Sequence, residues 1–207
     1  MVETSSDTKT PTKSARTRKR ILDAAAAEFR QAGYNARLVD IAERAGIQAG
    51  SLYYHFASRE ELVAEILQLG LATAFAQVRQ AVEELDGSDI ESDSRRRLET
   101  AIRAHTMAVL EQSDYASAQA KIVGQVPPDI AEAHKADQRS YGAYWNDLLE
   151  TAATAGVLRA DLDLFAARML AFGAMNWTTE WFDPSRRLSA DQIADTAVMM
   201  IMSGLAK

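Results

Sequence analysis

Residues 38–56 read LVDIAERAGIQAGSLYYHF, and this stretch decides the fold. Its apolar positions predict two short helices joined at Ala45-Gly46-Ile47, because glycine at position 46 permits the positive φ that a tight turn between helices requires. Ile41, Ile47 and Leu52 are spaced to pack on a preceding helix. The residues that remain on or beside the exposed face of the second helix are mostly polar or aromatic: Gln48, Ala49, Ser51, Tyr53, Tyr54 and His55. A short helix of this kind fits the major groove of DNA.

Helical patterns continue on both sides of this stretch. Upstream, a helix is expected from Arg16 to Gly33, with one apolar stripe made of Ile21, Leu22, Ala25 and Phe29. Downstream, residues 58–61 read SREE, the pattern of a capping box, and predict a long helix that ends near Asp86-Gly87. The quoted stretch is therefore the centre of a larger helical unit.

This unit resembles the TetR family of transcriptional regulators over about 45 residues, from Arg18 to Leu62. The matching residues read DIAERAGI at 40–47, GSLYYHF at 50–56 and SREEL at 58–62. The resemblance implies a homodimer that binds a palindromic double-stranded DNA operator through a helix-turn-helix. It also implies a ligand-responsive regulator, most often a repressor that a small-molecule effector releases from DNA.

The resemblance assigns roles residue by residue. Contacts to the DNA backbone are expected from Tyr53, His55 and Arg59. Positions near base edges are expected for Gln48, Ser51 and Tyr54, and Gly50 would let the helix approach the DNA closely. The chain departs from the family at Arg37, where Thr usually caps the helix, and at Gln48, where Ser is common. Arg37 is therefore a further candidate contact.

The remaining chain predicts helices at about 95–112, 128–155, 161–182 and 190–204, with short helical turns at 114–126 and a polar loop at 86–94. No stretch alternates as a half-buried strand does. We expect an all-α fold of about nine helices. Its parts would be a flexible arm at 1–15, a DNA-binding domain at 16–62 and a ligand-binding and dimerisation domain at 63–207.

Three of these helices carry a largely apolar face with a few polar groups, which indicates a ligand pocket or a plain core. The candidate lining residues are Ile102, His105, Tyr141, Trp145, Met169, Phe172 and Asn176. Asn176 is the most informative, because an amide on an apolar face needs a partner. Residues 144–149, 156–162 and 176–184 resemble the branch of the family that senses acyl-CoA thioesters, which implies an apolar or acyl-CoA-type effector.

The last two helices carry a second apolar stripe, which a partner subunit would cover. The candidate dimer residues are Ala174, Trp177, Trp181, Ala197 and Ile201.

Composition limits the alternatives. The chain has no Cys, 47% hydrophobic residues and a net charge of −6. Residues 1–62 hold ten basic and eight acidic side chains and are therefore slightly positive, whereas the rest of the chain is negative. This distribution of charge is typical of a protein that contacts DNA through one end. No apolar run is long enough for a membrane span, so a cytoplasmic protein is expected.

Three rival classes remain at this point: an enzyme, a metal sensor and an adaptor that does not bind DNA. The three histidines, His55, His105 and His134, are far apart in sequence, and no catalytic motif accompanies them. His134 and Asp137 form a possible ligand pair, but two ligands do not make a metal site. We therefore expect no enzymatic activity, no metal and no cofactor.

Overall fold

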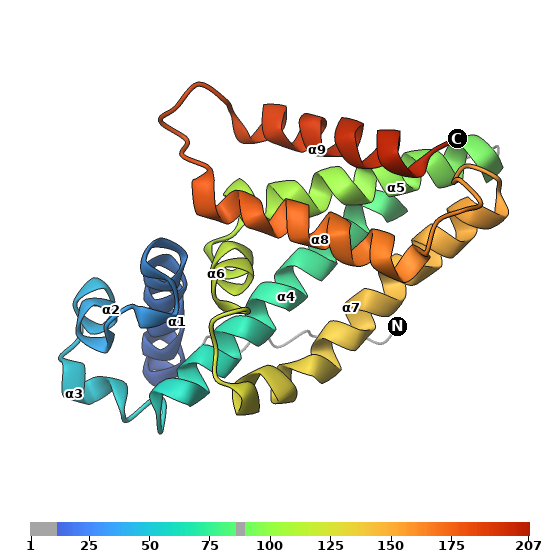
Figure 1. The fold of residues 1–207 in the computed structure, drawn as a ribbon. Helices are drawn as coiled ribbons and strands as arrows, with labels where there is room; N and C mark the ends of the chain where they lie inside the picture. The colour runs from blue at the N-terminus through green and yellow to red at the C-terminus, as the bar shows by residue number, and fades with distance from the viewer. Residues whose placement is uncertain (1–11, 86–89) are drawn as a thin grey trace, which may run out of the picture.

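The computed structural model describes residues 12–85 and 90–207 and confirms the all-α fold (Figure 1). In the described residues it contains nine α-helices: α1 Lys13–Ala32, α2 Leu38–Arg44, α3 Ala49–Leu52, α4 Arg59–Glu83, α5 Ile90–Met107, α6 Asp114–Ile122, α7 Pro128–Thr154, α8 Leu164–Trp181 and α9 Ala190–Leu205. Figure 1 shows α1–α3 at one end and α8 and α9 along one side of the larger C-terminal part.

Several predicted boundaries were wrong. The arm was expected to reach residue 15, but α1 begins at Lys13 because the Thr12 side chain accepts a hydrogen bond from Ala15 N. Residues 1–11 lie outside the described residues. The loop expected at 86–94 gives way to α5 from Ile90 onward, and residues 86–89 are not described.

The structure also differs from the prediction in the helical segments directly before and after Ser113. The helix expected at 95–112 continues past Met107 as a π-helical segment, Ala108–Gln112. The turns expected at 114–126 form one regular helix, α6, which the Ser113 side chain caps by accepting from Tyr115 N and Ala116 N. Val109, which lies in the π-helical segment, is buried as Ile102 and His105 are.

The N-terminal helices do not close a core by themselves. Their buried residues include Phe29, Ile41 and Leu52, and the same apolar cluster extends into α4 and into Ala118 and Ile122 of α6. The buried contacts therefore join residues on both sides of position 62, and the domain boundary placed there stays a prediction. The consequence is that α6, far away in sequence, completes the support of α1.

Helix α4 connects the two parts. Among the described residues it is the one helix that is long and apolar enough to cross a membrane, by length and composition only. It packs against α1, α5, α6 and α7, and Leu62, Ile66, Leu67 and Val78 are fully buried in the protein. These contacts are those of a core helix. The Ser58 side chain caps it as predicted, by accepting from Glu61 N at 3.1 Å.

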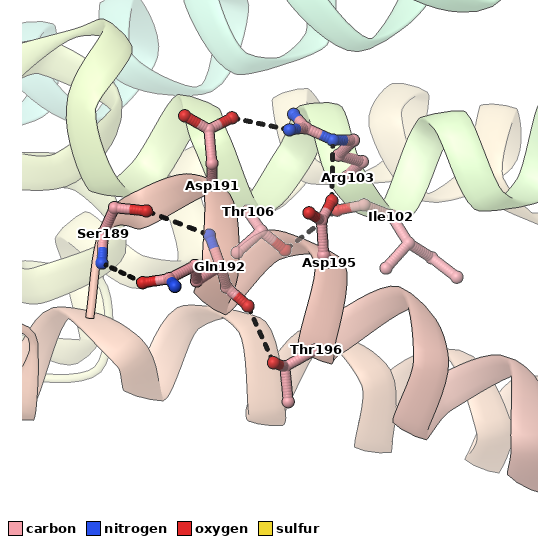
Figure 2. Close-up of polar contacts among 8 residues, drawn as sticks. All are labelled: Ile102, Arg103, Thr106, Ser189, Asp191, Gln192, Asp195 and Thr196. Carbon is pink, nitrogen blue, oxygen red and sulfur yellow. Dashed lines mark hydrogen bonds and ion pairs between the residues drawn. The ribbon is translucent and has the colours of Figure 1, made fainter. Parts of the chain in front are cut away.

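The C-terminal part has its own core between α4, α5, α7, α8 and α9. Figure 2 shows how α9 is fixed to α5: the guanidinium of Arg103 lies between Asp191 and Asp195, with Arg103 Nε at 3.1 Å from Asp195 Oδ1. The predicted cap at Ser189 is confirmed, since Ser189 and Gln192 form a reciprocal capping box. These exposed pairs set the orientation of α9 more than they stabilise the fold.

Candidate DNA interface and effector pocket

The candidate DNA interface lies at the free end of the N-terminal unit. Helix α3 is held from behind by Leu52 and Phe56, both buried, while Tyr54 is 89% exposed and Tyr53 58% exposed. Gln48, Gly50 and Arg37 are also exposed, and Ser51 and His55 are half-buried. These predicted contact residues are thus exposed or half-buried at the starts of α2 and α3, within α3 and directly after its end at Leu52.

The turn that positions α3 follows the sequence prediction. Gly46 has a φ of 66°, the left-handed region that residues with a side chain adopt at a cost. Neither Arg37 nor Gln48 makes a side-chain cap at the start of α2 or α3, which agrees with the departures from the family pattern at these positions. Their side chains are therefore available to a DNA partner.

Arg59 is placed differently from the other candidates. Its guanidinium donates to Ala36 O at 2.8 Å and to Tyr34 O, and it lies over the ring of Tyr34 at 5.0 Å. These contacts tie the start of α4 to the turn before α2. The role in DNA binding stays a prediction, but the contacts in the structure give Arg59 a structural role.

A cavity of about 510 Å³ lies between α5, α6, α7 and α8. It brings together five of the seven candidate ligand residues: His105, Tyr141, Met169, Phe172 and Asn176. Ile102 and Trp145 are buried but do not line it. Trp145 supports the wall from behind, with its ring centroid 5.1 Å from that of Phe172 and 6.1 Å from that of His105.

Sequence reasoning missed the polar mouth and the α6 wall of this cavity. The missed lining residues include Gln119 and Val123 next to the core, and Lys135, Arg139 and Arg168 at the more exposed positions. Lys135 and Arg139, four residues apart on the predicted 128–155 helix, were the available signal. None of the described lining residues is acidic, so a ligand with a negative charge is favoured over a cation.

Arg168 is fixed at this mouth. Its Nη1 donates to Gly142 O at 2.8 Å, and a Cβ at residue 142 would lie 2.4 Å from that same nitrogen. Gly142 therefore makes room for the guanidinium. Arg168 Nε is buried and has no partner among the described residues, so it is free to donate to an oxygen of a ligand.

At the other end of the cavity, His105 lies between two polar side chains. Its Nδ1 is 2.9 Å from Tyr141 Oη, and its Nε2 is 3.0 Å from Asn176 Oδ1. Burial lowers the pKa of His105 to about 4, against a smaller opposing effect of the hydrogen bond to Asn176. The imidazole is therefore neutral at neutral pH.

This shift predicts a pH dependence of stability. The folded protein favours neutral His105, so the stabilisation is complete above pH 6.5 and is lost as the pH falls from 6.5 towards 4. Over that window we expect the free energy of unfolding to fall by about 3 kcal/mol more in the wild type than in His105→Gln. Urea unfolding at one protein concentration measures it, and parallel pH profiles would contradict it. His134, whose pKa burial also lowers, is present in both proteins.

The apolar face predicted for a partner subunit is exposed on α8 and α9. It forms a groove that contains all five candidate dimer residues, Ala174, Trp177, Trp181, Ala197 and Ile201, together with exposed Leu170 and Met200. Trp177 is 65% exposed. Large apolar side chains so exposed in one chain indicate a surface that another molecule covers.

His134 is buried, with Nδ1 at 3.8 Å from Asp137 Oδ2. In residues 12–85 and 90–207 no group of three or more His, Asp or Glu side chains is arranged to hold a metal ion. This pair therefore gives no support to the metal-sensor alternative.

Two family models match the chain. The model described as "Bacterial regulatory proteins, tetR family" matches residues 21–66, and that described as "Tetracyclin repressor-like, C-terminal domain" matches residues 91–205. The second match covers the α5–α9 region that contains both the cavity and the apolar groove.

Individual relatives agree with these matches. The HTH-type transcriptional repressor KstR2 of Mycolicibacterium smegmatis is 30% identical, over 96% of this chain and 95% of that protein. The structure of ketosteroid transcriptional regulator KstR2 of Mycobacterium tuberculosis superposes with a TM-score of 0.73 and 28% identity, over 92% of this chain and 95% of that one. AibR in complex with isovaleryl coenzyme A and operator DNA has a TM-score of 0.75 at 22% identity, over 89% of this chain and 97% of that one, and shows the shared fold.

Proposed function

The chain belongs to the tetR family of bacterial regulatory proteins, and from this premise we propose that it is a homodimeric repressor that an acyl-CoA-type effector releases from its operator. The observation that carries the proposal is one molecule with exposed Tyr53 and Tyr54 directly after the short helix α3 at one end and, in its C-terminal part, an apolar cavity with a basic mouth. No catalytic role is proposed, and the site of action is the cytoplasm, where the operator DNA lies.

The DNA part of the proposal rests on α3. The exposed side chains on α3 and directly after it would enter the major groove, with Tyr54 near the bases and Tyr53 and His55 at phosphates. A two-fold dimer presents two copies of α3 to successive major grooves, so the operator would be palindromic.

The effector part rests on the two ends of the cavity. Its inner end is aromatic, with Tyr141 and Phe172 ring centroids 5.7 Å apart, and suits an apolar acyl group. Its mouth holds Lys135, Arg139 and Arg168 and suits the phosphates of coenzyme A. Lys135 already pairs with Glu132, and Arg168 donates to Gly142 O, but only a ligand with phosphates would add an anionic partner inside the cavity, which favours the acyl-CoA class.

Helix α6 is the element through which the effector would act. Gln119 and Val123 line the cavity, while on another side Tyr115 donates to Asp23 of α1 at 2.7 Å and Asp114 accepts from Arg30 at 2.8 Å. Helix α4 lies so close that a Cβ at Gly70 would be 2.3 Å from Tyr115 O.

An effector that displaces α6 would therefore move α1 and α4 as well. This movement would change the distance between the two α3 helices of a dimer. A change from roughly 99% to 1% of the DNA-competent form needs about 5.5 kcal/mol of differential binding.

The test measures by fluorescence anisotropy whether an effector releases the protein from DNA. The DNA is the region upstream of the gene that encodes the protein. Decanoyl-CoA is expected to release the wild-type protein, whereas free CoA and decanoate are not. Phe172→Asp should bind the operator as the wild type does but fail to respond, because a carboxylate in the aromatic end repels an apolar group. Ser140→Asp adds the same charge at an exposed α7 position outside the cavity lining and is the matched control. A normal response of Phe172→Asp would refute the assignment of the pocket.

A further inference from the structure

The inner end of the cavity contains a chain of three hydrogen-bonded side chains from three helices. Tyr141 of α7, His105 of α5 and Asn176 of α8 all line the cavity. Both ring nitrogens of His105 are occupied, one by Tyr141 Oη at 2.9 Å and the other by Asn176 Oδ1 at 3.0 Å. The rings of Phe172 and Trp145 surround this chain, at centroid distances of 5.1 Å and 6.1 Å from His105.

The protons in this chain have one arrangement. The amide oxygen of Asn176 can only accept, so His105 Nε2 carries the proton and donates it. A neutral imidazole has a single N–H, so Nδ1 accepts, and the hydroxyl of Tyr141 donates to it. Burial keeps both groups in the required state, since it lowers the pKa of His105 to about 4 and raises the pKa of Tyr141 above its ordinary value.

These three hydrogen-bonded side chains leave one hydrogen-bond donor for a ligand. With Oδ1 committed to His105, the amide Nδ2 of Asn176 is the remaining polar group of that side chain, and it has no hydrogen-bond partner among the described residues. Asn176 is half-buried and lines the cavity together with the rings of Tyr141 and Phe172 and the amide of Gln119. A ligand that covers this donor binds more favourably if it brings an acceptor, because a donor that loses its contact with water and gains no new hydrogen bond costs free energy.

We propose that Asn176 selects effectors by donating from Nδ2 to the carbonyl oxygen of their acyl group, and that His105 and Tyr141 are positioning residues that hold the amide in the donating orientation. The inference rests on the proposed function, because it takes this cavity as the effector site. The inference gives the amide of Asn176 a role in ligand recognition and assigns the discrimination between ligands to one hydrogen bond. Groups that can only donate, or that lack oxygen, would leave the amide unpaired.

The test compares two probes that differ only in that oxygen: decanoyl-CoA and its thioether analogue S-decyl-CoA, titrated into the full-length protein by calorimetry. The wild type is expected to bind decanoyl-CoA about tenfold more tightly. In Asn176→Leu the ratio of the two affinities should fall to about one. Because the ratio compares two ligands on one protein, a general loosening of the pocket does not change it.

A second measurement concerns the positioning residues. Nitrogen-15 NMR of the wild-type protein should find His105 in the Nε2–H form, and Tyr141→Phe, which removes the donor to Nδ1, should mix the two neutral forms and lower the affinity ratio. Asn176→Asp should raise the pKa of His105, since a carboxylate then faces Nε2.

The outcomes are distinct. Equal binding of both probes by the wild type, an unchanged ratio in Asn176→Leu, or His105 in the Nδ1–H form overturns the inference and leaves the proposed function intact. Binding of neither probe overturns the proposed effector class and this inference with it.

Discussion

Replacing Met200 by Glu is expected to turn the dimer into monomers and to lower operator affinity by roughly 10²- to 10⁴-fold, because the second half-site is then no longer bound by a linked partner. Met200 lies in the apolar groove of α8 and α9 and is 68% exposed in the single chain. A charge there harms no contact within the monomer. In a dimer it would be buried without a partner, which is strongly unfavourable.

The chain provides a matched control in the next residue. Met199 is 62% exposed, yet it lines the opposite side of α9, towards Arg103 and Glu99, and is absent from the apolar groove. Met199→Glu should therefore remain dimeric and bind DNA normally. Light scattering gives the oligomeric state of both variants. If Met200→Glu stays dimeric, or if both variants dissociate alike, the α8–α9 groove is not the dimer interface.

The second large effect is expected at the recognition helix. Tyr54→Ala should lower operator affinity by on the order of 100-fold or more, since a lost groove contact costs about 1–3 kcal/mol and the two-fold symmetry doubles it. Tyr54 is 89% exposed, so its removal takes little from the fold, and the melting temperature should be unchanged.

The control for Tyr54→Ala is a truncation at an exposed position away from the recognition helix. Ser140→Ala removes an exposed hydroxyl on α7 and should bind the operator as the wild type does. Anisotropy titrations at several salt concentrations add a second criterion, because phosphate contacts make the affinity fall steeply with salt. Wild-type affinity in Tyr54→Ala would remove α3 from the DNA interface.

Much of the fold could be predicted because its signals are local. Gly46 marks a turn through the conformational freedom of its own backbone. Ser58 and Ser189 mark helix starts because each side chain accepts a hydrogen bond from the backbone N–H three residues later. Apolar spacing placed Leu98, Ile102 and His105 correctly on one buried face of α5. Such features depend on neighbours in sequence, and the sequence contains them in full.

The candidate site was predicted less completely, for a physical reason. The periodicity of apolar residues shows that one face of a helix is apolar, but it does not show which residues of that face line a cavity. Ile102 and Trp145 lie behind the wall that Tyr141 and Phe172 form. The difference depends on how far each helix is rotated and how closely its neighbours approach, which are properties of packing across several helices.

Three features were therefore determined by the sequence alone: an all-helical chain, a helix-turn-helix with Tyr54 outward, and an apolar stripe with Trp177 left without a partner in one chain. The tertiary structure alone decided that Arg59 binds the carbonyls of Tyr34 and Ala36 and that α6 packs on α1. It also decided that His105 lies between Tyr141 and Asn176. The hydrogen bonds of Arg59 and His105 join residues 23 to 71 positions apart in the chain, and which partner a polar side chain finds at that separation is fixed only when the helices pack together.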